Sequence, residues 1–568
     1  MGNRVYAGQE LLTDPYLQHP TDDSVLVEWY TEYKGEDNCV ELFENGTDNE
    51  PSRIIKASTV KLSRIRGGKN NKNFDDSSVK ADIYKHKAVI DNLPEYHGKE
   101  SERVLYRVIS DGAVSDIYSL SAIPQPGTEL KILLTSDLQM KDMCAANFEM
   151  VEKEIGRIDA VFVNGDCVDV TDRAYDWFYS DNSFFRVLQG KANHKTGNRR
   201  YKGGSIIQSA PVYVSVGNHD VMGIYDEEVP ISFQFNSPKP RFYAEEKYEQ
   251  LTDKDSVDKE KFIKDNSFNT DTYEEIFDLP LNNKGKELYY TLSIGDVDMI
   301  VLDTSRVWRQ PMLGITGKYT ESPDTPKEFY GYGDFIFEDI SEGSDQLAFL
   351  KREIKKQSYK DAKYKLVMFH FQYHSLGGNQ IPPYTDPVAS EVTDPVSGKK
   401  MVTYDYPKSE DYIDKYVAPL LEEGGVDLLF TGHSHVWDRF KTESGMNILE
   451  SSNIGNTYNC FMEPDIRSDY PSAIDKDDPR HAIADNWDKE NYVLSGDPYG
   501  LKPESPNIKK LPDNKPYLAS NTITAFSVLD TGKGTVDSYY FDTENPDKGV
   551  VLFDSFNIKR ENSGKLSH

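Results

Sequence analysis

The hydrophobic pattern divides the chain into two unlike parts. As far as about residue 121, short runs alternate apolar and polar side chains, which is typical of half-buried β-strands. The clearest runs are Ser24–Thr31, Cys39–Phe43 and Arg103–Ile109, and the last leads through Asp111-Gly112 into a further short run. Asp-Gly between β-rich runs favours a hairpin, and several short strands in succession indicate a β-sandwich.

A break in this pattern separates the two parts. Ile123-Pro-Gln-Pro-Gly127 has no periodicity, and two prolines with a glycine are typical of a linker. We therefore expect a boundary near residue 126, with residues 1–126 forming one domain and residues 127–568 the other.

Beyond the boundary, short continuous apolar runs alternate with helical patterns. Such runs are typical of the buried strands of an α/β protein. They are Leu130–Thr135, Ala160–Val163, Val212–Val216, Asp298–Leu302, Lys365–Phe369 and Asp427–Thr431, and helices are expected over Ala145–Ile155, Asp345–Gln357 and Tyr412–Glu422. Thr522–Leu529 and Thr535–Phe541 flank a turn and predict a hairpin that closes a second sheet.

Long polar segments separate these elements. They cover residues 176–210, 221–288, 305–345, 376–410 and 456–518. Uncommonly long loops in a compact domain are often functional, so we interpret these segments as surface insertions around a site.

Charge and composition exclude several classes of protein. The formal net charge of −30 disfavours nucleic acid as a general partner, and no apolar run is long enough to span a membrane. The four cysteines have no paired spacing, which argues against a disulfide framework or a zinc cluster.

The chain starts without a basic-then-apolar leader, which fits a cytosolic protein or a secreted one whose leader is absent from this chain. The acidic, tyrosine-rich, cysteine-poor composition favours an exported or cell-surface bacterial protein.

Five segments at the ends of apolar runs carry side chains that can bind metal. They are Ser136-Asp137-Leu138-Gln139, Gly165-Asp166-Cys167-Val168-Asp169, Gly217-Asn218-His219-Asp220, Phe369-His370 and Gly432-His433-Ser434-His435. Taken alone, an Asp or His after a strand is more often a turn, a cap or a structural residue. In an α/β sheet, however, ligands converge at the carboxyl ends of strands, so the recurring placement indicates one shared site.

In this order the motifs resemble those of the calcineurin-like metallophosphoesterase superfamily. The resemblance implies a four-layer α/β/β/α catalytic domain with long insertions. Asp14-Pro-Tyr-Leu-Gln18, Trp29 and Tyr106-Arg107-Val108 also resemble the fibronectin-III-like β-sandwich that precedes the catalytic domain of purple acid phosphatases. The implied fold class is thus an N-terminal β-sandwich followed by an α/β metallophosphoesterase domain.

The resemblance implies a set of metal ligands bridged by Asp166. One metal would take Asp137, Gln139, Asp166 and His435, and the other would take Asp166, Asn218, His370 and His433. Two ions can polarise a phosphoryl group, bind the attacking hydroxide and clamp an in-line displacement. Mixed oxygen and imidazole ligands suit iron, manganese or zinc.

Two positions depart from the purple acid phosphatases. Asp169 stands where those enzymes have the tyrosine that colours the iron site, and Gln139 stands where other branches have His or Gln. The resemblance places His219 against the phosphate, with Asp169 orienting its imidazole or, alternatively, capping the next helix. His374 could reach substrate or be an ordinary surface histidine.

These residues predict an enzyme that hydrolyses phosphate esters. The expected substrate is a small phosphate monoester, with a phosphodiester or a nucleotide as the alternative, since the same metal core serves all of these reactions. From another class, we consider a surface adhesin or carbohydrate-binding protein whose phosphoesterase domain is inactive. The complete ligand set argues against this second class.

Overall fold

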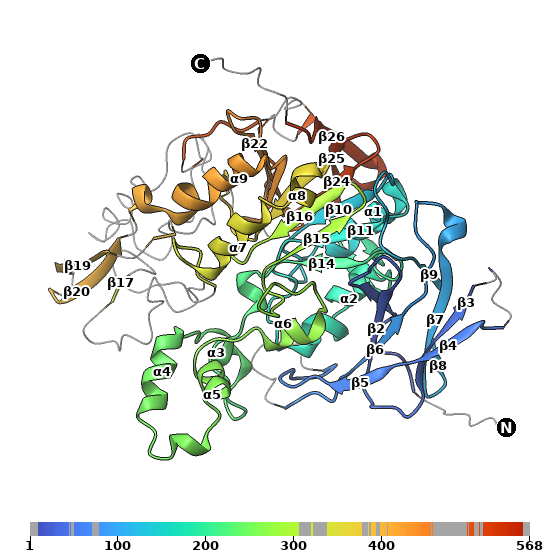
Figure 1. Ribbon diagram of the computed structural model, residues 1–568, viewed down its shortest axis with the longest axis horizontal. Helices are drawn as coiled ribbons and strands as arrows, with labels where there is room; N and C mark the ends of the chain where they lie inside the picture. Colours follow the sequence, from blue (N-terminus) through green and yellow to red (C-terminus); the bar gives the residue numbers. More distant parts are fainter. Residues whose placement is uncertain are drawn as a thin grey trace.

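The computed structural model describes most of the chain. The described residues are 9–44, 46, 50–70, 79–305, 320–321, 338–377, 384–385, 388–393, 398–405, 407–455, 457, 460, 497, 499–504, 510–511 and 515–560. Figure 1 shows the N-terminal strands on the right and the remaining layers to their left.

The N-terminal part consists of two antiparallel sheets packed face to face. One contains β1 (Tyr16–Gln18), β2 (Val25–Thr31), β6 (Tyr84–Ile90) and β5 (Ser58–Lys61) in that order. The other contains β4 (Arg53–Lys56), β3 (Asn38–Phe43), β7 (Val104–Ser110) and β8 (Ala113–Val114), and β9 (Tyr118–Leu120) also pairs with β7. Every second residue of β7 is buried, and Trp29 and Tyr106 share one core between the sheets. The sandwich predicted from alternation is confirmed.

A six-stranded sheet begins immediately after the linker. Its order is β14 (Val212–Val214), β11 (Ala160–Val163), β10 (Lys131–Thr135), β24 (Ile523–Asp530), β25 (Thr535–Asp542) and β26 (Val550–Asn557). The first three strands are parallel, whereas β24 to β26 are antiparallel. The predicted C-terminal hairpin exists, but the prediction that it closes a second sheet is wrong, because β24 pairs with β10 itself.

A second six-stranded sheet packs on the first. Its order is β15 (Tyr290–Ile294), β16 (Val297–Val301), β18 (Tyr364–Met368), β21 (Leu428–Thr431), β23 (Asn447–Ser451) and β22 (Trp437–Lys441). Successive residues of β18 belong to different cores: Leu366 and Met368 face the first sheet, whereas Val367 packs with the outer helices. This alternation follows from the two-residue period of a strand, and it explains why a strand covered on both faces is apolar throughout.

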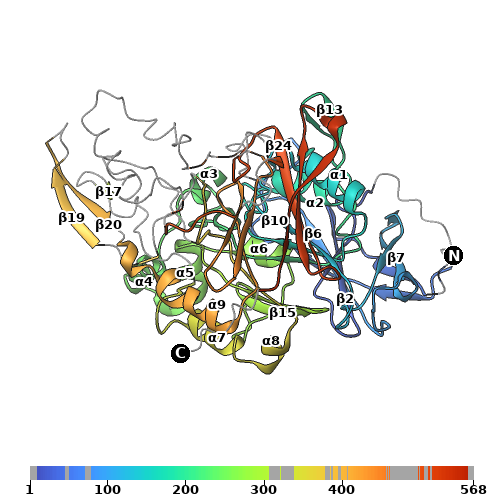
Figure 2. The same ribbon diagram turned by 90° about the horizontal axis from the view of Figure 1, so that it is seen from above.

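Helices cover the outer faces of both sheets. On the first sheet lie α1 (Cys144–Ile155) and α2 (Phe184–Leu188), and the second is covered by α7 (Asp345–Glu353), α8 (Gln357–Asp361) and α9 (Ala418–Gly424). The arrangement is the expected α/β/β/α sandwich, which Figure 2 shows from above. The predicted helix over Asp345–Gln357 ends earlier, at Glu353, and the one over Tyr412–Glu422 begins as a π-helical turn, Ile413–Val417.

The insertion between β14 and β15 is largely helical. It contains α3 (Ile231–Phe235), α4 (Arg241–Glu249), α5 (Lys259–Asn266) and α6 (Asp271–Ile276), which lie at the lower left and centre of Figure 1. Two small sheets stand apart from the larger ones: the hairpin of β12 (His194–Thr196) with β13 (Arg199–Tyr201), and the three-stranded sheet of β17 (Thr320–Glu321), β20 (Lys400–Asp405) and β19 (Val388–Thr393). Large parts of the predicted insertions 305–345, 376–410 and 456–518 lie outside the described residues.

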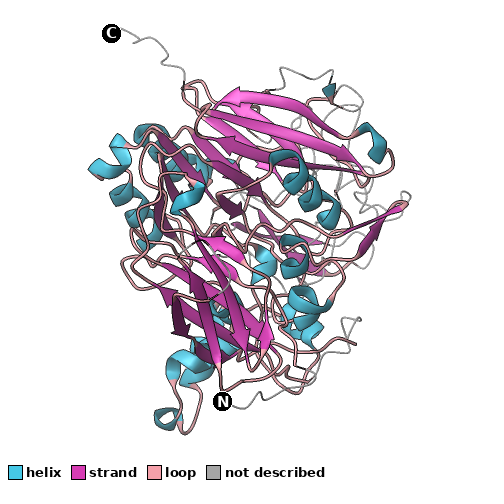
Figure 3. Cartoon of the chain, turned by 90° about the vertical axis from the view of Figure 1, so that its right-hand side faces the viewer, coloured by secondary structure: helices cyan, strands magenta, loops and turns pink. Residues whose placement is uncertain are grey.

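The N-terminal sandwich, whose strands lie above the label N in Figure 3, adjoins the edge of the first catalytic sheet. Leu17 of β1 bridges to Pro211 just before the edge strand β14, and Gln18 Nε2 donates to the carbonyl oxygen of Val212 at 2.6 Å. We propose residue 126 as the boundary between two domains that fold against each other. No helix within the described residues is both long and apolar enough to cross a membrane.

Candidate metal centre

The strand ends of both catalytic sheets carry the predicted site residues. Asp137 and Gln139 follow β10, Asp166 follows β11, and Asn218 and His219 begin a 3₁₀ turn after β14. In the second sheet His370 follows β18, while His433 and His435 follow β21. Because β10, β11 and β14 are parallel, as are β18 and β21, their carboxyl ends each lie at one edge of their sheet.

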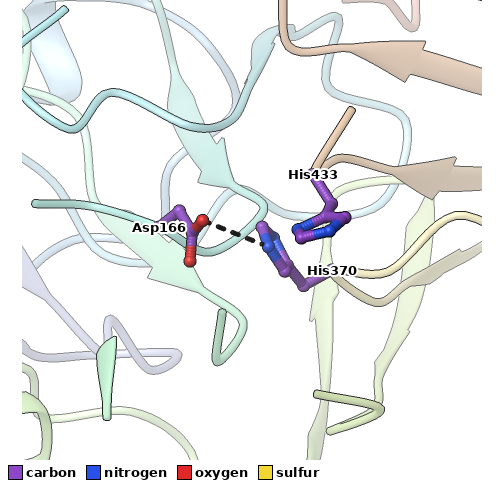
Figure 4. A group of neighbouring side chains, drawn as sticks. All are labelled: Asp166, His370 and His433. Atoms are coloured by element: carbon purple, nitrogen blue, oxygen red, sulfur yellow. Dashed lines mark ion pairs between the residues drawn. The ribbon is translucent and has the colours of Figure 1, made fainter. Parts of the chain in front are cut away.

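Two groups of potential ligands share one carboxylate. Asp166, His370 and His433 form one group, and Asp137, Asp166 and His435 form the other; within each group the ligand atoms lie within 4.8 Å of one another. Figure 4 shows Asp166 facing the two histidines of the first group. All five side chains are buried. A carboxylate common to two groups is the arrangement that a bridged pair of ions requires.

Short contacts connect the remaining predicted ligands to these groups. His370 Nε2 lies 3.4 Å from Asp166 Oδ2 and 3.3 Å from Asn218 Oδ1. Gln139 Nε2 donates to Asp166 Oδ2 at 2.8 Å, and His435 Nε2 lies 3.3 Å from Asp137 Oδ1. The structure thus brings all seven predicted ligand residues to one place.

The second nitrogen of His370 is fixed by the main chain. His370 Nδ1 donates to the carbonyl oxygen of Asn164 at 2.7 Å, which turns Nε2 towards Asp166. Metal-binding histidines commonly donate their other ring nitrogen in this way. Asn164 also donates from Nδ2 to the carbonyl oxygens of Phe369 and Phe430, so it ties β11 to β18 and β21.

The electrostatics of the group favour an ionised carboxylate. Burial opposes ionisation of Asp166, but the charges of His370, His219 and His433 and a hydrogen bond from His370 together outweigh burial and hold the pKa of Asp166 well below its usual range. For His370, burial favours the neutral ring, yet the Asp166 carboxylate raises its pKa to about 10.

Glycines allow the strand ends to approach one another. A Cβ on Gly217 would lie 2.3 Å from Asp166 N and Oδ1, and one on Gly432 would lie 2.3 Å from Ser136 Oγ. The ligand residues adopt an unusual backbone as well: φ is positive at Asp137, Asp166 and His433, and also at Gln139 and His435. Such conformations in non-glycine residues cluster at functional sites.

The donor atoms fit a metal. Within the described part of the chain, Asp137 Oδ1 and Gln139 Oε1 are buried and have no hydrogen-bond donor, a state that normally costs about 1 to 3 kcal/mol. Ligation of a cation would satisfy both oxygens. In Gln139 the nitrogen Nε2 now faces Asp166. Ligation through Oε1 therefore requires the terminal amide to rotate by half a turn, so that its oxygen and nitrogen exchange places.

His219 is held from two sides and is only half-buried. Its Nδ1 donates to the main-chain carbonyl oxygen of Asp169 at 2.7 Å, and its ring lies against Phe235 with centroids 5.5 Å apart. The contact with Asp169 therefore involves the main chain, whereas the sequence suggested an orienting carboxylate or, alternatively, a helix cap. A carbonyl only accepts, so Nδ1 keeps its proton and Nε2 is the nitrogen that can exchange one.

His374 contacts residues other than those of the two potential ligand groups. It is 6% exposed, its Nδ1 lies 3.0 Å from Asp497 Oδ2, and its ring packs against Tyr373, Tyr499 and Phe440. The surface-histidine alternative is wrong because the ring is buried. Contact with substrate stays a prediction without structural support.

Asp220 is a supporting residue whose role the sequence left open. Its carboxylate accepts from the main-chain nitrogens of Asp166, Cys167 and Gly217 at 2.8 to 3.1 Å, so it holds the two strand-end loops together. Asn164 was missed entirely. Its position at a strand end, directly before Gly165-Asp166, was the available signal.

Comparison with known proteins identifies the family. Residues 130–437, more than half of the chain, match the sequence profile of the calcineurin-like phosphoesterases. The chain belongs to this family and is a phosphoric ester hydrolase. The hypothesis of an adhesin with an inactive domain is not retained.

A solved structure gives the fold independently. The purple acid phosphatase PPD1 from yellow lupin (Lupinus luteus) seeds superposes with a TM-score of 0.51 at 13% identity, covering 95% of this chain and 73% of that one. PhoD gives a TM-score of 0.45 at 12% identity, covering 97% and 93%. The lupin enzyme shares the fold of this chain. A search of curated proteins found no match.

Proposed function

We propose that the protein is a phosphomonoesterase with two metal ions bridged by Asp166. Asp137, Gln139 and His435 would complete the ligands of one ion, and Asn218, His370 and His433 those of the other. Imidazole and oxygen donors in one set suit iron, manganese or zinc. The sharing of Asp166 by two potential ligand groups is the observation that carries the proposal.

The bound metals would supply Lewis-acid charge to the phosphoryl group and an activated water as the nucleophile. The chain's own residues hold this arrangement in place. Asp220 and Asn164 fix the loops, and the ring nitrogen of His370 that faces away from Asp166 is satisfied by a carbonyl. A site assembled in advance in this way needs little reorganisation when charge develops on the phosphate.

His219 is the proposed general acid. Its Nδ1 is occupied by the Asp169 carbonyl oxygen, so Nε2 would deliver a proton to the leaving alkoxide oxygen. Its main-chain nitrogen donates to Asp166 Oδ1 at 2.7 Å, which keeps the residue beside the bridging carboxylate. The substrate would be a small phosphate ester of an alcohol.

Replacing the bridge tests the site. Asp166→Ala should lose most bound metal and, with it, several kcal/mol of transition-state stabilisation, about 10³-fold in kcat/KM. Asp172→Asn is the matched control, since Asp172 is equally buried but its carboxylate binds Thr272. Elemental analysis and hydrolysis of alkyl and nitrophenyl phosphates measure both effects. Two metals per chain in active Asp166→Ala would refute the assignment.

The same assay compares ester classes. A phosphomonoesterase should turn over a nitrophenyl monoester much faster than the corresponding bis-ester, whereas the reverse ratio would identify a phosphodiesterase. Export of the protein is a separate proposal that rests on composition alone, and cell fractionation of the source organism would test it.

A further inference from the structure

A small apolar cluster lies beneath His219, separate from the main cores. It consists of Val170, Met222, Ile231 and Phe235, each at most 7% exposed. Val170 directly follows Asp169, whose carbonyl oxygen holds His219 Nδ1, and Phe235 provides the ring against which the imidazole lies. The position of the imidazole therefore depends on how α3, which carries Ile231 and Phe235, is held against Val170.

A buried arginine of the N-terminal part holds α3 at its start. Arg66 is 1% exposed, and its Nη2 and Nη1 donate to the carbonyl oxygens of Asp226 and Val229 at 2.6 and 3.0 Å. Gln234 Nε2, from within α3, donates to the same two carbonyls at 2.5 and 3.1 Å. The turn at residues 226–229 is thus fixed between the N-terminal part and α3.

The main chain of Arg66 holds the other side of His219. Arg66 N donates to the carbonyl oxygen of Asp172 at 2.8 Å, and Ala174 N donates to the carbonyl oxygen of Arg66 at 2.8 Å. These bonds form a parallel bridge between Arg66 and Arg173, in the segment that follows Asp169. One residue of the N-terminal part therefore contacts both segments that position the imidazole.

The chemistry of Arg66 fits positioning better than simple filling of space. Among the described residues it forms no close ion pair, and the Asp172 and Glu227 carboxylates act on it from farther away, so these charges offset only part of the desolvation that its burial costs. An apolar side chain of similar length would avoid that cost. What only the planar guanidinium supplies is a fork that reaches two carbonyl oxygens at a fixed separation.

We propose that Arg66 is a positioning residue for His219, acting through the 226–229 turn and the ring of Phe235. The N-terminal sandwich thereby takes part in catalysis without touching substrate. This inference rests on the proposed function of His219 as the acid that protonates the leaving group.

The first test compares Arg66→Met with Arg103→Met. Arg103 is the matched control because it also donates to carbonyl oxygens, of Ser119 and of Ser209 in the catalytic part, at 2.8 and 2.7 Å. Arg66→Met should keep both metals and reduce kcat for an alkyl phosphate about 10-fold, with a much smaller loss for nitrophenyl phosphate, whose phenolate leaves without a proton. Arg66→Lys should fall in between, and Arg103→Met should lose similar amounts, if any, on both substrates.

A double-variant cycle separates positioning from general destabilisation. If Arg66 acts through His219, adding Arg66→Met to His219→Ala should cause no further loss on the alkyl phosphate. Multiplicative losses in the double variant, or equal losses on both substrates in Arg66→Met, would overturn the inference. Where Arg66→Met fails to fold, Arg66→Lys carries the same cycle.

Hydrogen exchange keeps this inference distinguishable from the proposed function. Arg66→Met should speed amide exchange across residues 226–236 while leaving β10 and β18 protected, and Arg103→Met should not. Unchanged exchange over 226–236 would overturn the role of Arg66. Near-normal turnover of the alkyl phosphate by His219→Ala would instead refute the acid role, and faster exchange in Arg66→Met would then still support Arg66 as the residue that holds α3.

Discussion

The proposed ligand residues lie on a strained backbone that the surrounding fold maintains. Asp137, Asp166 and His433 have φ values of 58°, 53° and 78°, where a side chain costs about 1 to 3 kcal/mol per residue. Main-chain bonds offset part of this cost: Asp137 Oδ2, for example, accepts from His433 N at 2.9 Å. The strain turns side chains from neighbouring strand ends towards a common point.

Asp169 illustrates the limit of sequence reasoning at the residue scale. The motif correctly put Asp169 beside His219, but the observed contact runs from its carbonyl oxygen, which any amino acid possesses. Side-chain identity carries no information about such a contact. The sequence could bring the proposed metal ligands together because their chemistry resides in the side chains themselves.

Substitution of Asp169 distinguishes these two modes of contact. Asp169→Ala keeps the carbonyl that holds His219, so we expect both metals to be retained and kcat for an alkyl phosphate to fall less than about 10-fold. His219→Ala should lose about 10²- to 10⁴-fold on that substrate. Steady-state kinetics with metal analysis measures both variants. Equal, large losses would restore the carboxylate as the orienting group.

At the scale of elements, the strands were predicted well and the connections were not. β11 has the predicted bounds and β10, β16, β18 and β21 differ by one residue, because continuous apolar runs are what a sheet covered on both faces requires. The partner of the C-terminal hairpin was predicted wrongly, since antiparallel pairing of β24 with β10 joins residues about 400 positions apart and leaves no local pattern. The helices α3 to α6 were missed because each is short and their segment is largely polar.

The loop after β14 needs glycine at Gly217 for steric reasons alone. Its φ of −103° is ordinary, yet an added Cβ would meet Asp166 N and Oδ1 at 2.3 Å. We expect Gly217→Ala to displace Asp166 and to lower metal content and activity together. Gly285→Ala, with φ of 72° and open space around it, should lose about 1 to 2 kcal/mol of stability but no metal. Full metal content in Gly217→Ala would contradict this role.

β6 carries a buried histidine that makes stability depend on pH. His86 is fully buried between Thr31 and Thr59, and burial lowers its pKa to about 4. The unfolded chain, with a pKa near 6.5, binds this proton first as pH falls. The resulting stability is therefore present above pH 6.5 and is lost as pH falls towards 4, by about 3 kcal/mol.

Denaturant unfolding at several pH values measures this contribution. His86→Gln should flatten the decline in the free energy of unfolding between pH 6.5 and 4, whatever its effect at neutral pH. His97→Gln, at a largely exposed histidine of the same sandwich, should leave the decline unchanged. An identical pH slope in wild-type protein and His86→Gln would show that other groups dominate acid destabilisation.

On the scale of the whole molecule, the N-terminal sandwich stabilises an otherwise open sheet edge. β14 is the last strand of the first catalytic sheet, and an unpaired edge is a site for aggregation. The hydroxyls of Tyr16 and Tyr30 both donate to the carbonyl oxygen of Ile276, at 2.5 and 3.2 Å, and so tie the sandwich to the end of α6. The sequence predicted the sandwich and the linker, but these contacts depend on surface complementarity that no periodic pattern encodes.

Gln18 offers the sharpest test of this junction. Its amide is fully buried, donates to the carbonyl oxygen of Val212 at 2.6 Å and accepts from Asp278 N at 2.9 Å. Gln18→Ala would leave both main-chain groups unsatisfied, at about 1 to 3 kcal/mol each. Because these groups belong to the catalytic part while Gln18 belongs to the sandwich, we expect calorimetry to show one cooperative transition at a lower Tm. The exposed Gln250→Ala should leave the Tm unchanged. Two separate transitions, with only the first shifted, would mean that the sandwich and the catalytic part unfold independently.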